Sequence, residues 1–358
     1  MSQRTEMEPT RTAVREPRVA PAPPSPQANP SRIFQTINAY QQTAALRAAI
    51  ELDIFTAIDE GLTTAKEIAQ RATAAERGVR VLCDFLVILG FLTKNGARYG
   101  LAQDSAVFLN RHSPAYMGVA VRFLNTPQIM DAYNDFTAAV RKGGTVLGGE
   151  GTVEAENPIW VEFARSMAPM MLMPAQMLAK IVGGDSGGAM KVLDIAAGHG
   201  LFGIMIAKQN PQAQIVALDW PQVLAVAGEN AHKAGVEGRY ATLPGSAFEV
   251  EFGAGYNLVL LTNFLHHFDP PTCERLLRKV HACLEPGGRV AILEFVPNED
   301  RVTPPEAASF SIIMLGTTPS GDAYTLSEFE RMLGSAGFGR AKLVRLEQMP
   351  ESVILASK

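Results

Sequence analysis

Two adjacent histidines are the side chains in this sequence that best suit acid–base chemistry near neutral pH. His266 and His267 follow an apolar run, Leu258–Thr262, that has the composition of a buried strand. A neutral imidazole can take a proton from a weakly acidic group because its own pKa is about 6.5. Neighbouring histidines also suggest a metal site, but they lack the i, i+4 spacing of two ligands on one helix face. The pair therefore suits acid–base chemistry better than metal binding, and a purely structural role on the cofactor side is the alternative.

A glycine-rich loop is the second chemical feature. Gly198, Gly200 and Gly203 have the spacing of a dinucleotide-binding turn. Asp194 comes just before the loop, and Asp219 follows it by about 20 residues. The loop has no Lys or Arg, and Asp194 would place a negative charge near a pyrophosphate, which counts against NAD. S-adenosylmethionine has no phosphate and carries an ammonium and a sulfonium group, so an acidic loop suits it better. Asp219 suits the ribose hydroxyls of both molecules, and NAD stays an alternative.

These residues need a sheet that brings the carboxyl ends of several strands together. From about residue 190 onward, apolar runs typical of strands alternate with helical patterns. The alternation predicts an α/β fold in which a doubly wound parallel sheet binds its ligand at the carboxyl edge. The expected strands are Val192–Ala196, Ile215–Asp219, Leu258–Thr262 and Val290–Glu294, and the expected helices begin at Leu201, Pro221 and Thr272.

The first third of the chain predicts a separate, α-rich domain. Apolar residues recur at helical spacing over 33–52, a helix is expected from Thr63, and another is expected over Ala75–Leu89. Two short strands around an Asn-Gly turn at Asn95 complete a winged helix. Winged helices can bind DNA through their second helix, but Val79–Leu89 is apolar nearly all round, which predicts a buried helix. We expect an architectural or dimer-forming domain, with a DNA-binding, ligand-sensing regulator as the alternative.

A helical region over 114–182 is expected to join the two domains. It ends in closely spaced aromatic and methionine side chains that suit either a packed core or a pocket for a flat apolar ligand. The candidate pocket residues are Phe163, Met167, Met170, Met171 and, further along the chain, Met314. The predicted organisation is a Pro-rich disordered tail (1–30), a winged-helix domain (31–110), a helical linker with substrate-pocket residues (111–185) and a Rossmann-like domain (186–358).

Composition limits the partners and the compartment. The 358 residues carry a net charge of −4, and the pI is about 5.9, so the chain has no global electrostatic attraction to nucleic acid or an anionic membrane. Three cysteines without CxxC spacing argue against a disulfide framework and a zinc site. No run approaches the ~18 apolar residues of a membrane span, and the N-terminus lacks the apolar core of a signal peptide. We expect a soluble, cytoplasmic protein that binds a small molecule.

Three motifs resemble those of class I S-adenosylmethionine-dependent methyltransferases. They are V-L-D-I-A-A-G-H-G from Val192, L-H-H-F-D from Leu265 and L-E-P-G-G-R-V from Leu284. The domain order over 33–358 is similar to that of the small-molecule O-methyltransferases related to the acetylserotonin, caffeic acid and bacterial polyketide enzymes. The resemblance implies methyl transfer to a hydroxyl of a small aromatic or natural-product substrate. It also implies a homodimer formed by the N-terminal domains and a C-terminal antiparallel hairpin, with strands at Lys342–Glu347 and Val353–Ala356.

The resemblance assigns the cofactor residues. It places Gly198 and Gly200 beneath the methionine part of the cofactor, Asp219 at the ribose and Trp220 near the adenine. An acidic residue often follows the third strand in this family, and Ser246 stands there in this sequence. The expected cofactor-binding residues are Asp194, Ala196, Gly198, Gly200, Asp219, Trp220, Ser246, Ala247, Phe248 and Asn263.

The resemblance also assigns the catalytic residues. His266 matches the family's catalytic histidine by its distance from Cys273 and by its position after Leu258–Thr262, which corresponds to the fourth strand of the family's fold. His267 is the second choice. Plant relatives flank this histidine with two glutamates. Glu294 matches the first, but Ala323 stands at the second position. The base is then held differently or the substrate differs, and C-methylation or a non-methylating use of the cofactor stay alternatives.

Overall fold

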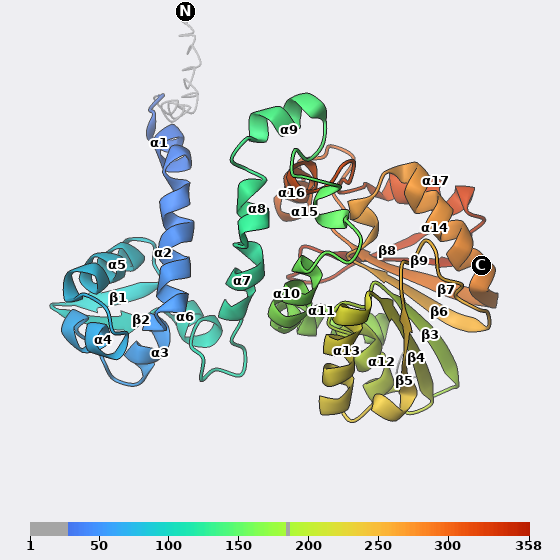
Figure 1. Ribbon diagram of the computed structural model, residues 1–358, viewed down its shortest axis with the longest axis horizontal. Coiled ribbons are helices and arrows are strands. Elements are labelled where there is room, and N and C mark those ends of the chain that lie inside the picture. Colours follow the sequence, from blue (N-terminus) through green and yellow to red (C-terminus); the bar gives the residue numbers. More distant parts are fainter. Residues whose placement is uncertain (1–27, 184–186) are drawn as a thin grey trace, which may run out of the picture.

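A small helical domain and a larger α/β domain are joined by a helical connector (Figure 1). The computed structural model describes residues 28–183 and 187–358. The predicted disordered tail therefore lies outside the described residues as far as residue 27, and so do residues 184–186 of the predicted glycine linker.

The N-terminal domain has the predicted order of helices followed by a hairpin. Thr64 begins its fourth helix with a capping box, because the Thr64 hydroxyl accepts the Glu67 N–H and the Glu67 carboxylate accepts the Thr64 N–H. The hairpin turns at Asn95, as expected. The elements are α1 (Ser31–Ile37), α2 (Ala39–Glu51), α3 (Ile54–Asp59), α4 (Ala65–Arg71), α5 (Glu76–Ile88), β1 (Leu92–Asn95) and β2 (Arg98–Leu101).

Helix α5 departs from its prediction. Val79, Cys83 and Leu86 face the core of the N-terminal domain and are buried. Val81 and Ile88, on the rest of the helix surface, are 47% and 78% exposed. The expectation of a helix buried all round is therefore wrong for the single chain, because the small domain offers the helix only one core to cover.

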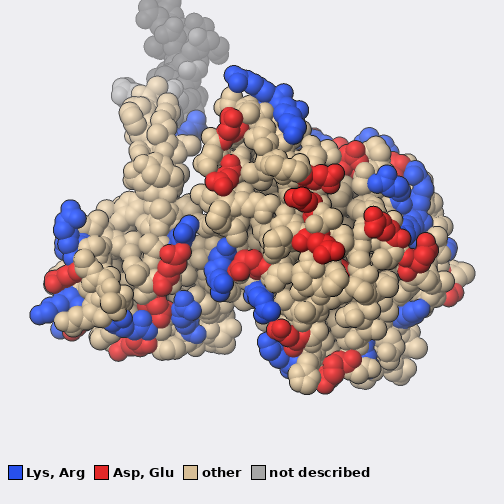
Figure 2. Space-filling model, in the orientation of Figure 1, with Lys and Arg blue, Asp and Glu red and all other residues tan. Residues whose placement is uncertain are grey.

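Helices α1 and α2 expose a row of large apolar side chains. The exposed fractions of Ile33, Phe34, Ile37 and Tyr40 lie between 59% and 67%. The column formed by these helices carries few charged side chains on the face that Figure 2 shows. We call these four residues the N-terminal apolar face. Such a face is typical of a protein–protein interface.

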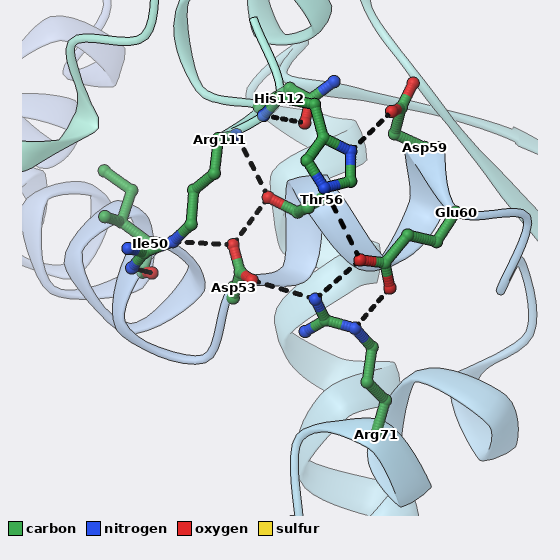
Figure 3. A network of polar contacts seen from close by, with 9 residues as sticks. Ile50, Asp53, Thr56, Asp59, Glu60, Arg71, Arg111 and His112 are labelled. Atoms are coloured by element: carbon green, nitrogen blue, oxygen red, sulfur yellow. Dashed lines mark hydrogen bonds and ion pairs between the residues drawn. The ribbon is translucent and has the colours of Figure 1, made fainter.

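A network of ion pairs fixes the point where the chain leaves the N-terminal domain (Figure 3). Asp53 has left-handed backbone geometry (φ 56°), and its carboxylate accepts hydrogen bonds from Arg71 at 3.0 Å and from Arg111 at 2.9 Å. The Thr56 hydroxyl accepts the backbone N–H of Arg111 at 3.1 Å, and Arg71 also pairs with Glu60. Because Arg111 lies after the hairpin, these contacts set the direction in which the connector departs.

The connector is helical but not continuous. The expectation of a wholly helical region over 114–182 is wrong for 143–158, where only a short 3-10 turn, η2 (Gly151–Val153), interrupts irregular chain. Gly143 ends a helix with φ 80°, and a Cβ at Gly151 would lie 2.3 Å from the Thr317 carbonyl oxygen. The elements are α6 (Gln103–Phe108), η1 (Gly118–Ala120), α7 (Val121–Leu124), α8 (Pro127–Asp131), α9 (Phe136–Lys142), α10 (Ile159–Ser166) and α11 (Ala168–Ile181).

The C-terminal domain is built on a seven-stranded sheet of order β5-β4-β3-β6-β7-β9-β8. Neighbours from β5 to β7 are parallel, and β9 runs antiparallel to both β7 and β8, which confirms the doubly wound sheet and the terminal hairpin. The strands are β3 (Met190–Ile195), β4 (Ala213–Asp219), β5 (Tyr240–Pro244), β6 (Tyr256–Thr262), β7 (Leu284–Glu294), β8 (Lys342–Arg345) and β9 (Ser352–Ser357). The helices are α12 (Leu201–Gln209), α13 (Pro221–Lys233), α14 (Pro270–Cys283), α15 (Pro305–Ala308), α16 (Phe310–Thr317) and α17 (Leu326–Ser335).

The sheet is covered on both faces. Leu258–Leu261 in β6 form an unbroken buried run, as expected for a parallel strand covered on both sides. Helices α14 and α17 contribute to the core on one face, and α11, α12 and α13 contribute to the core on the other. The strand order reverses between β3 and β6, so the loops that follow these two strands open a crevice at the carboxyl edge.

Across the two described ranges, no helix has the length and apolar character needed to cross a membrane.

Candidate active site

A cavity of about 1360 Å³ opens at the carboxyl edge of the sheet and brings most of the predicted site residues together. Three predicted residues, Asp194, Gly200 and Glu294, do not line it. The predicted residues that do line it are Ala196, Gly198, Asp219, Trp220, Ser246, Ala247, Phe248, Asn263, Phe163, Met167, Met170, Met171, Met314, His266 and His267.

The glycine loop is held tightly between β3 and α12. Gly198 (φ 57°) and Gly200 (φ 76°) both have backbone geometry that favours glycine. A Cβ at Gly200 would lie only 2.5 Å from the Tyr240 hydroxyl oxygen. The Gly198 N–H donates to the Asp219 carboxylate at 2.8 Å, so the loop and the end of β4 are fixed to each other. This arrangement explains why these positions are glycines.

Asp219 combines access to the cavity with two backbone hydrogen bonds. Its carboxylate accepts the N–H groups of Gly198 at 2.8 Å and Trp220 at 2.7 Å. Burial raises the pKa of Asp219 to about 6, although these two hydrogen bonds oppose the shift. A carboxylate oxygen can accept further hydrogen bonds, so Asp219 can bind a hydroxyl in the cavity.

Asp194 lies beneath the loop rather than in the cavity wall. Its side chain is fully buried, and one oxygen accepts the Gly203 N–H at 3.1 Å. Burial raises the pKa of Asp194 to about 7, which weakens the argument that its negative charge faces a cationic ligand. The geometry gives Asp194 a supporting position under the turn, and its predicted contact with the cofactor stays a prediction.

His266 and Glu294 form a buried pair at the centre of the crevice. His266 lies in the 3-10 turn η5 (Leu265–His267) after β6, and Glu294 ends β7. The His266 Nδ1 lies 2.5 Å from a Glu294 carboxylate oxygen, and the two residues are 4% and 1% exposed. The other Glu294 oxygen accepts the backbone N–H groups of Phe264 at 3.0 Å and His266 at 3.3 Å. A carboxylate at Nδ1 favours the proton on that nitrogen, which leaves Nε2 of the cavity-lining ring free to accept one.

His267 is packed differently from its neighbour. Its ring lies edge-on to Trp160, with 5.1 Å between the ring centroids, and 4.2 Å from the ring of His266. Burial lowers the pKa of His267 well below its usual value, and His266 adds to the effect. Its Nδ1 is buried with no hydrogen-bond partner among the described residues. His267 is therefore neutral and lacks the carboxylate that orients His266.

Aromatic side chains that the sequence analysis missed form one wall beside His266. Phe295 and Phe310 stack with their ring centroids 3.9 Å apart, and Phe310 lies 4.8 Å from the His266 ring. Both phenylalanines line the cavity. Met314, which lies in the same helix as Phe310 (α16), lines it too. Phe295 directly follows Glu294, so its position next to the predicted catalytic residue could have identified it. Nothing in the sequence indicates that α16, which carries Phe310, packs over His266.

Two family models match this chain. The O-methyltransferase domain matches residues 137–339, and the O-methyltransferase dimerisation domain matches residues 34–111. The chain belongs to the O-methyltransferase family. The dimerisation domain includes three of the four residues of the N-terminal apolar face, all but Ile33, and supports a homodimer. The enzyme is an S-adenosylmethionine-dependent methyltransferase.

Several proteins named as methyltransferases are similar to this chain. A 3-hydroxy-5-methyl-1-naphthoate 3-O-methyltransferase of Streptomyces sahachiroi is 30% identical over 85% of this chain and 88% of its own length. A crystal structure of a candidate O-methyltransferase from Nostoc punctiforme is 52% identical, covers 93% of this chain and 100% of that chain, and has a TM-score of 0.90. Human N-acetylserotonin methyltransferase, solved in complex with SAM, is 22% identical, covers 93% of this chain and 99% of that chain, and shares the fold with a TM-score of 0.81.

The residues of this methyltransferase fit S-adenosylmethionine. Asp219 offers acceptor oxygens to the ribose hydroxyls, and Phe248 and Trp220 offer apolar surface to an adenine. The Asn263 Oδ1 is a buried acceptor without a partner among the described residues, and Asn263 lines the cavity next to the loop after β3. An ammonium group supplies the donor that this oxygen lacks. These contacts are our proposal for how the cofactor is held.

The second glutamate of the resemblance has no counterpart beside His266. Ala323 is buried (1% exposed) and carries no polar group, and a Cβ at the nearby Gly321 would lie 2.2 Å from the His266 carbonyl oxygen. Asp322 pairs with Arg301 at 3.2 Å instead. In the described part of the chain, Glu294 is therefore the carboxylate that holds the His266 ring.

Proposed function

We propose that this enzyme transfers the methyl group of S-adenosylmethionine to a hydroxyl oxygen of a small aromatic compound, with His266 as general base. The observation that carries the proposal is the buried His266–Glu294 pair. Glu294 occupies the Nδ1 of His266, and His266 lines the cavity with its Nε2 free to accept a proton. The Phe295–Phe310 stack beside it favours a flat aromatic acceptor.

When bound, the cofactor would supply an activated methyl group and keep the electron pair of the broken carbon–sulfur bond as a neutral thioether. The protein must hold the acceptor oxygen in line with that methyl group and remove its proton. His266 Nε2 would take the hydroxyl proton as the acceptor oxygen receives the methyl group. Glu294, bound at Nδ1, stabilises the positive charge that forms on the ring.

The order of the two events follows from ordinary acidities. An unperturbed imidazole has a pKa of about 6.5 and a phenol about 10, so complete proton transfer before methylation costs about 5 kcal/mol. Transfer of the proton as the methyl group arrives avoids most of that cost. We therefore expect general-base catalysis rather than a free phenolate, with a contribution of roughly 10²- to 10⁴-fold in rate.

The choice of oxygen over carbon needs an experiment, because an L-tyrosine C(3)-methyltransferase of Streptomyces lavendulae is 27% identical to this chain. Catechols, hydroxynaphthoates, hydroxyquinones and hydroxybenzoates should be incubated with the enzyme and S-adenosylmethionine. Mass spectrometry detects the methylated product, and proton NMR distinguishes a methoxy group from a ring methyl group. Methoxy products would support the proposal. Ring-methylated products only, or no methylated product from any class, would contradict it.

A further inference from the structure

The carboxylates that line the cavity differ sharply in burial. Four of them, Glu150, Glu156, Glu249 and Glu306, are exposed at the rim. Asp219 and Asp269 are half-buried, and both accept backbone N–H groups. Glu351 is only 3% exposed. Neither the glycine loop nor the histidine pair uses it.

Glu351 has a carboxyl oxygen that accepts no hydrogen bond from any described residue. Its Oε2 is buried and has no hydrogen-bond partner among the described residues. A buried carboxyl oxygen without a partner destabilises the folded protein, because no hydrogen bond replaces the one it made to water. Such a group is retained at low cost only where something outside the chain supplies the missing hydrogen bond.

The sheet topology places Glu351 on the side of the histidine pair away from the proposed cofactor residues. The proposed cofactor residues follow β3, β4 and β5, and His266 follows β6. Glu351 immediately precedes Ser352, the first residue of β9, and Ser352 pairs with Glu294 at the end of β7. Strand β9 lies two positions beyond β6, and adjacent strands are about 4.8 Å apart, so Glu351 begins about 10 Å further along the sheet edge. That span suits an acceptor of two fused or linked rings.

The chemistry of a carboxyl group decides what it binds. Burial raises the pKa of Glu351, and the neighbouring Glu294 adds to the effect. The ionised group accepts hydrogen bonds, and the protonated group still has a carbonyl oxygen that accepts one. Both forms therefore suit a ligand with an N–H or O–H donor.

We propose that Glu351 is a specificity-determining residue that binds an O–H or N–H group at the end of the aromatic acceptor remote from the methylated hydroxyl. This inference rests on the proposed function for the identity of the cavity's ligand. Acceptors with a second donor at the far end of a two-ring system should bind better than otherwise identical acceptors without one.

The test compares three probes that differ at one position. Naphthalene-2,6-diol, 2-naphthol and 6-methoxy-2-naphthol should be titrated calorimetrically into the protein saturated with S-adenosylhomocysteine. We expect the diol to bind about 10-fold or more tightly than the other two. Glu351→Leu should remove this preference, and Glu351→Gln, which keeps an acceptor oxygen, should retain most of it. Glu306→Leu is the matched control, because Glu306 also lines the cavity but is exposed, and it should keep the wild-type preference.

Two results would overturn the proposal. The first is a wild-type protein that binds the diol no more tightly than 2-naphthol. This measurement needs no variant, so it does not depend on whether Glu351→Leu folds. The other is a Glu351→Leu protein that still binds S-adenosylhomocysteine and keeps the wild-type preference. The test measures binding and not turnover. An enzyme that does not methylate these probes would therefore contradict the proposed function, while the binding preference would still test the role of Glu351.

Discussion

Replacing Glu294 by Gln should slow methyl transfer while the protein stays folded. The Glu294 carboxylate accepts three hydrogen bonds, from the backbone N–H groups of Phe264 and His266 and from the His266 ring. Alanine would leave three donors without an acceptor, at about 1–3 kcal/mol each, and the sum rivals the whole stability of a domain, about 5–15 kcal/mol. Gln keeps the shape and an acceptor oxygen and removes the charge.

The size of the effect follows from the lost charge. A hydrogen bond to a charged group contributes about 1.5–3 kcal/mol, so the imidazolium that forms on His266 should lose about that much stabilisation. The expected fall in kcat is roughly 10- to 150-fold. Initial rates at saturating S-adenosylmethionine measure it, with an acceptor taken from the screen.

Calorimetric affinity for S-adenosylhomocysteine separates catalysis from structure in this experiment. We expect Glu294→Gln to bind the product cofactor as the wild type does, because Glu294 does not line the cavity. Glu294→Asp is the control that keeps the charge at a shorter reach. A Glu294→Gln enzyme with wild-type kcat, or one that loses cofactor affinity and kcat in parallel, would refute the reasoning.

Three further predictions concern the cofactor loop and the dimer. Affinity for S-adenosylhomocysteine should strengthen as pH rises through about 6, where Asp219 ionises, and Asp219→Asn should remove that dependence; an equal pH profile for both proteins would contradict it. Gly200→Ala should lower thermal stability and weaken cofactor binding, since its Cβ would lie 2.5 Å from the Tyr240 hydroxyl and φ is 76°; an unchanged Tm would exclude this. Ile37→Asp should shift the protein towards monomers in light scattering, and an intact dimer would show that the N-terminal apolar face is not the interface.

The sequence predicted those features that depend on local pattern. Continuous apolar runs marked the buried strands, such as β6, and the glycine spacing located the turn after β3. The sequence places His266 after the strand Leu258–Thr262 and Glu294 at the end of the strand Val290–Glu294, and in the structure the His266 Nδ1 lies 2.5 Å from a Glu294 oxygen. Elements with a strong hydrophobic period can be predicted from the sequence. Residues at strand ends can be assigned to one site, because the carboxyl ends of parallel strands lie along one edge of the sheet.

The sequence could not predict features that depend on what packs against a residue. Helix α5 was expected to be buried all round, yet Ile88 is 78% exposed in the single chain. The sequence predicts that Asp194 contacts the cofactor beside the glycine loop. The structure shows that Asp194 lies beneath the turn, where its carboxylate accepts the Gly203 N–H. Glu351 carries no local signal, because its burial is set by the pairing of β9 with β7.

The most direct test of the proposed mechanism compares the wild type with His266→Ala and His267→Ala. Initial rates should be measured with an accepted phenol at saturating S-adenosylmethionine from pH 6 to 9, alongside the calorimetric affinity for S-adenosylhomocysteine. We predict that His266→Ala lowers kcat by roughly 10²- to 10⁴-fold with cofactor affinity nearly unchanged, and that His267→Ala costs much less. Wild-type turnover by His266→Ala across that range would exclude the general-base role and leave positioning alone to explain catalysis.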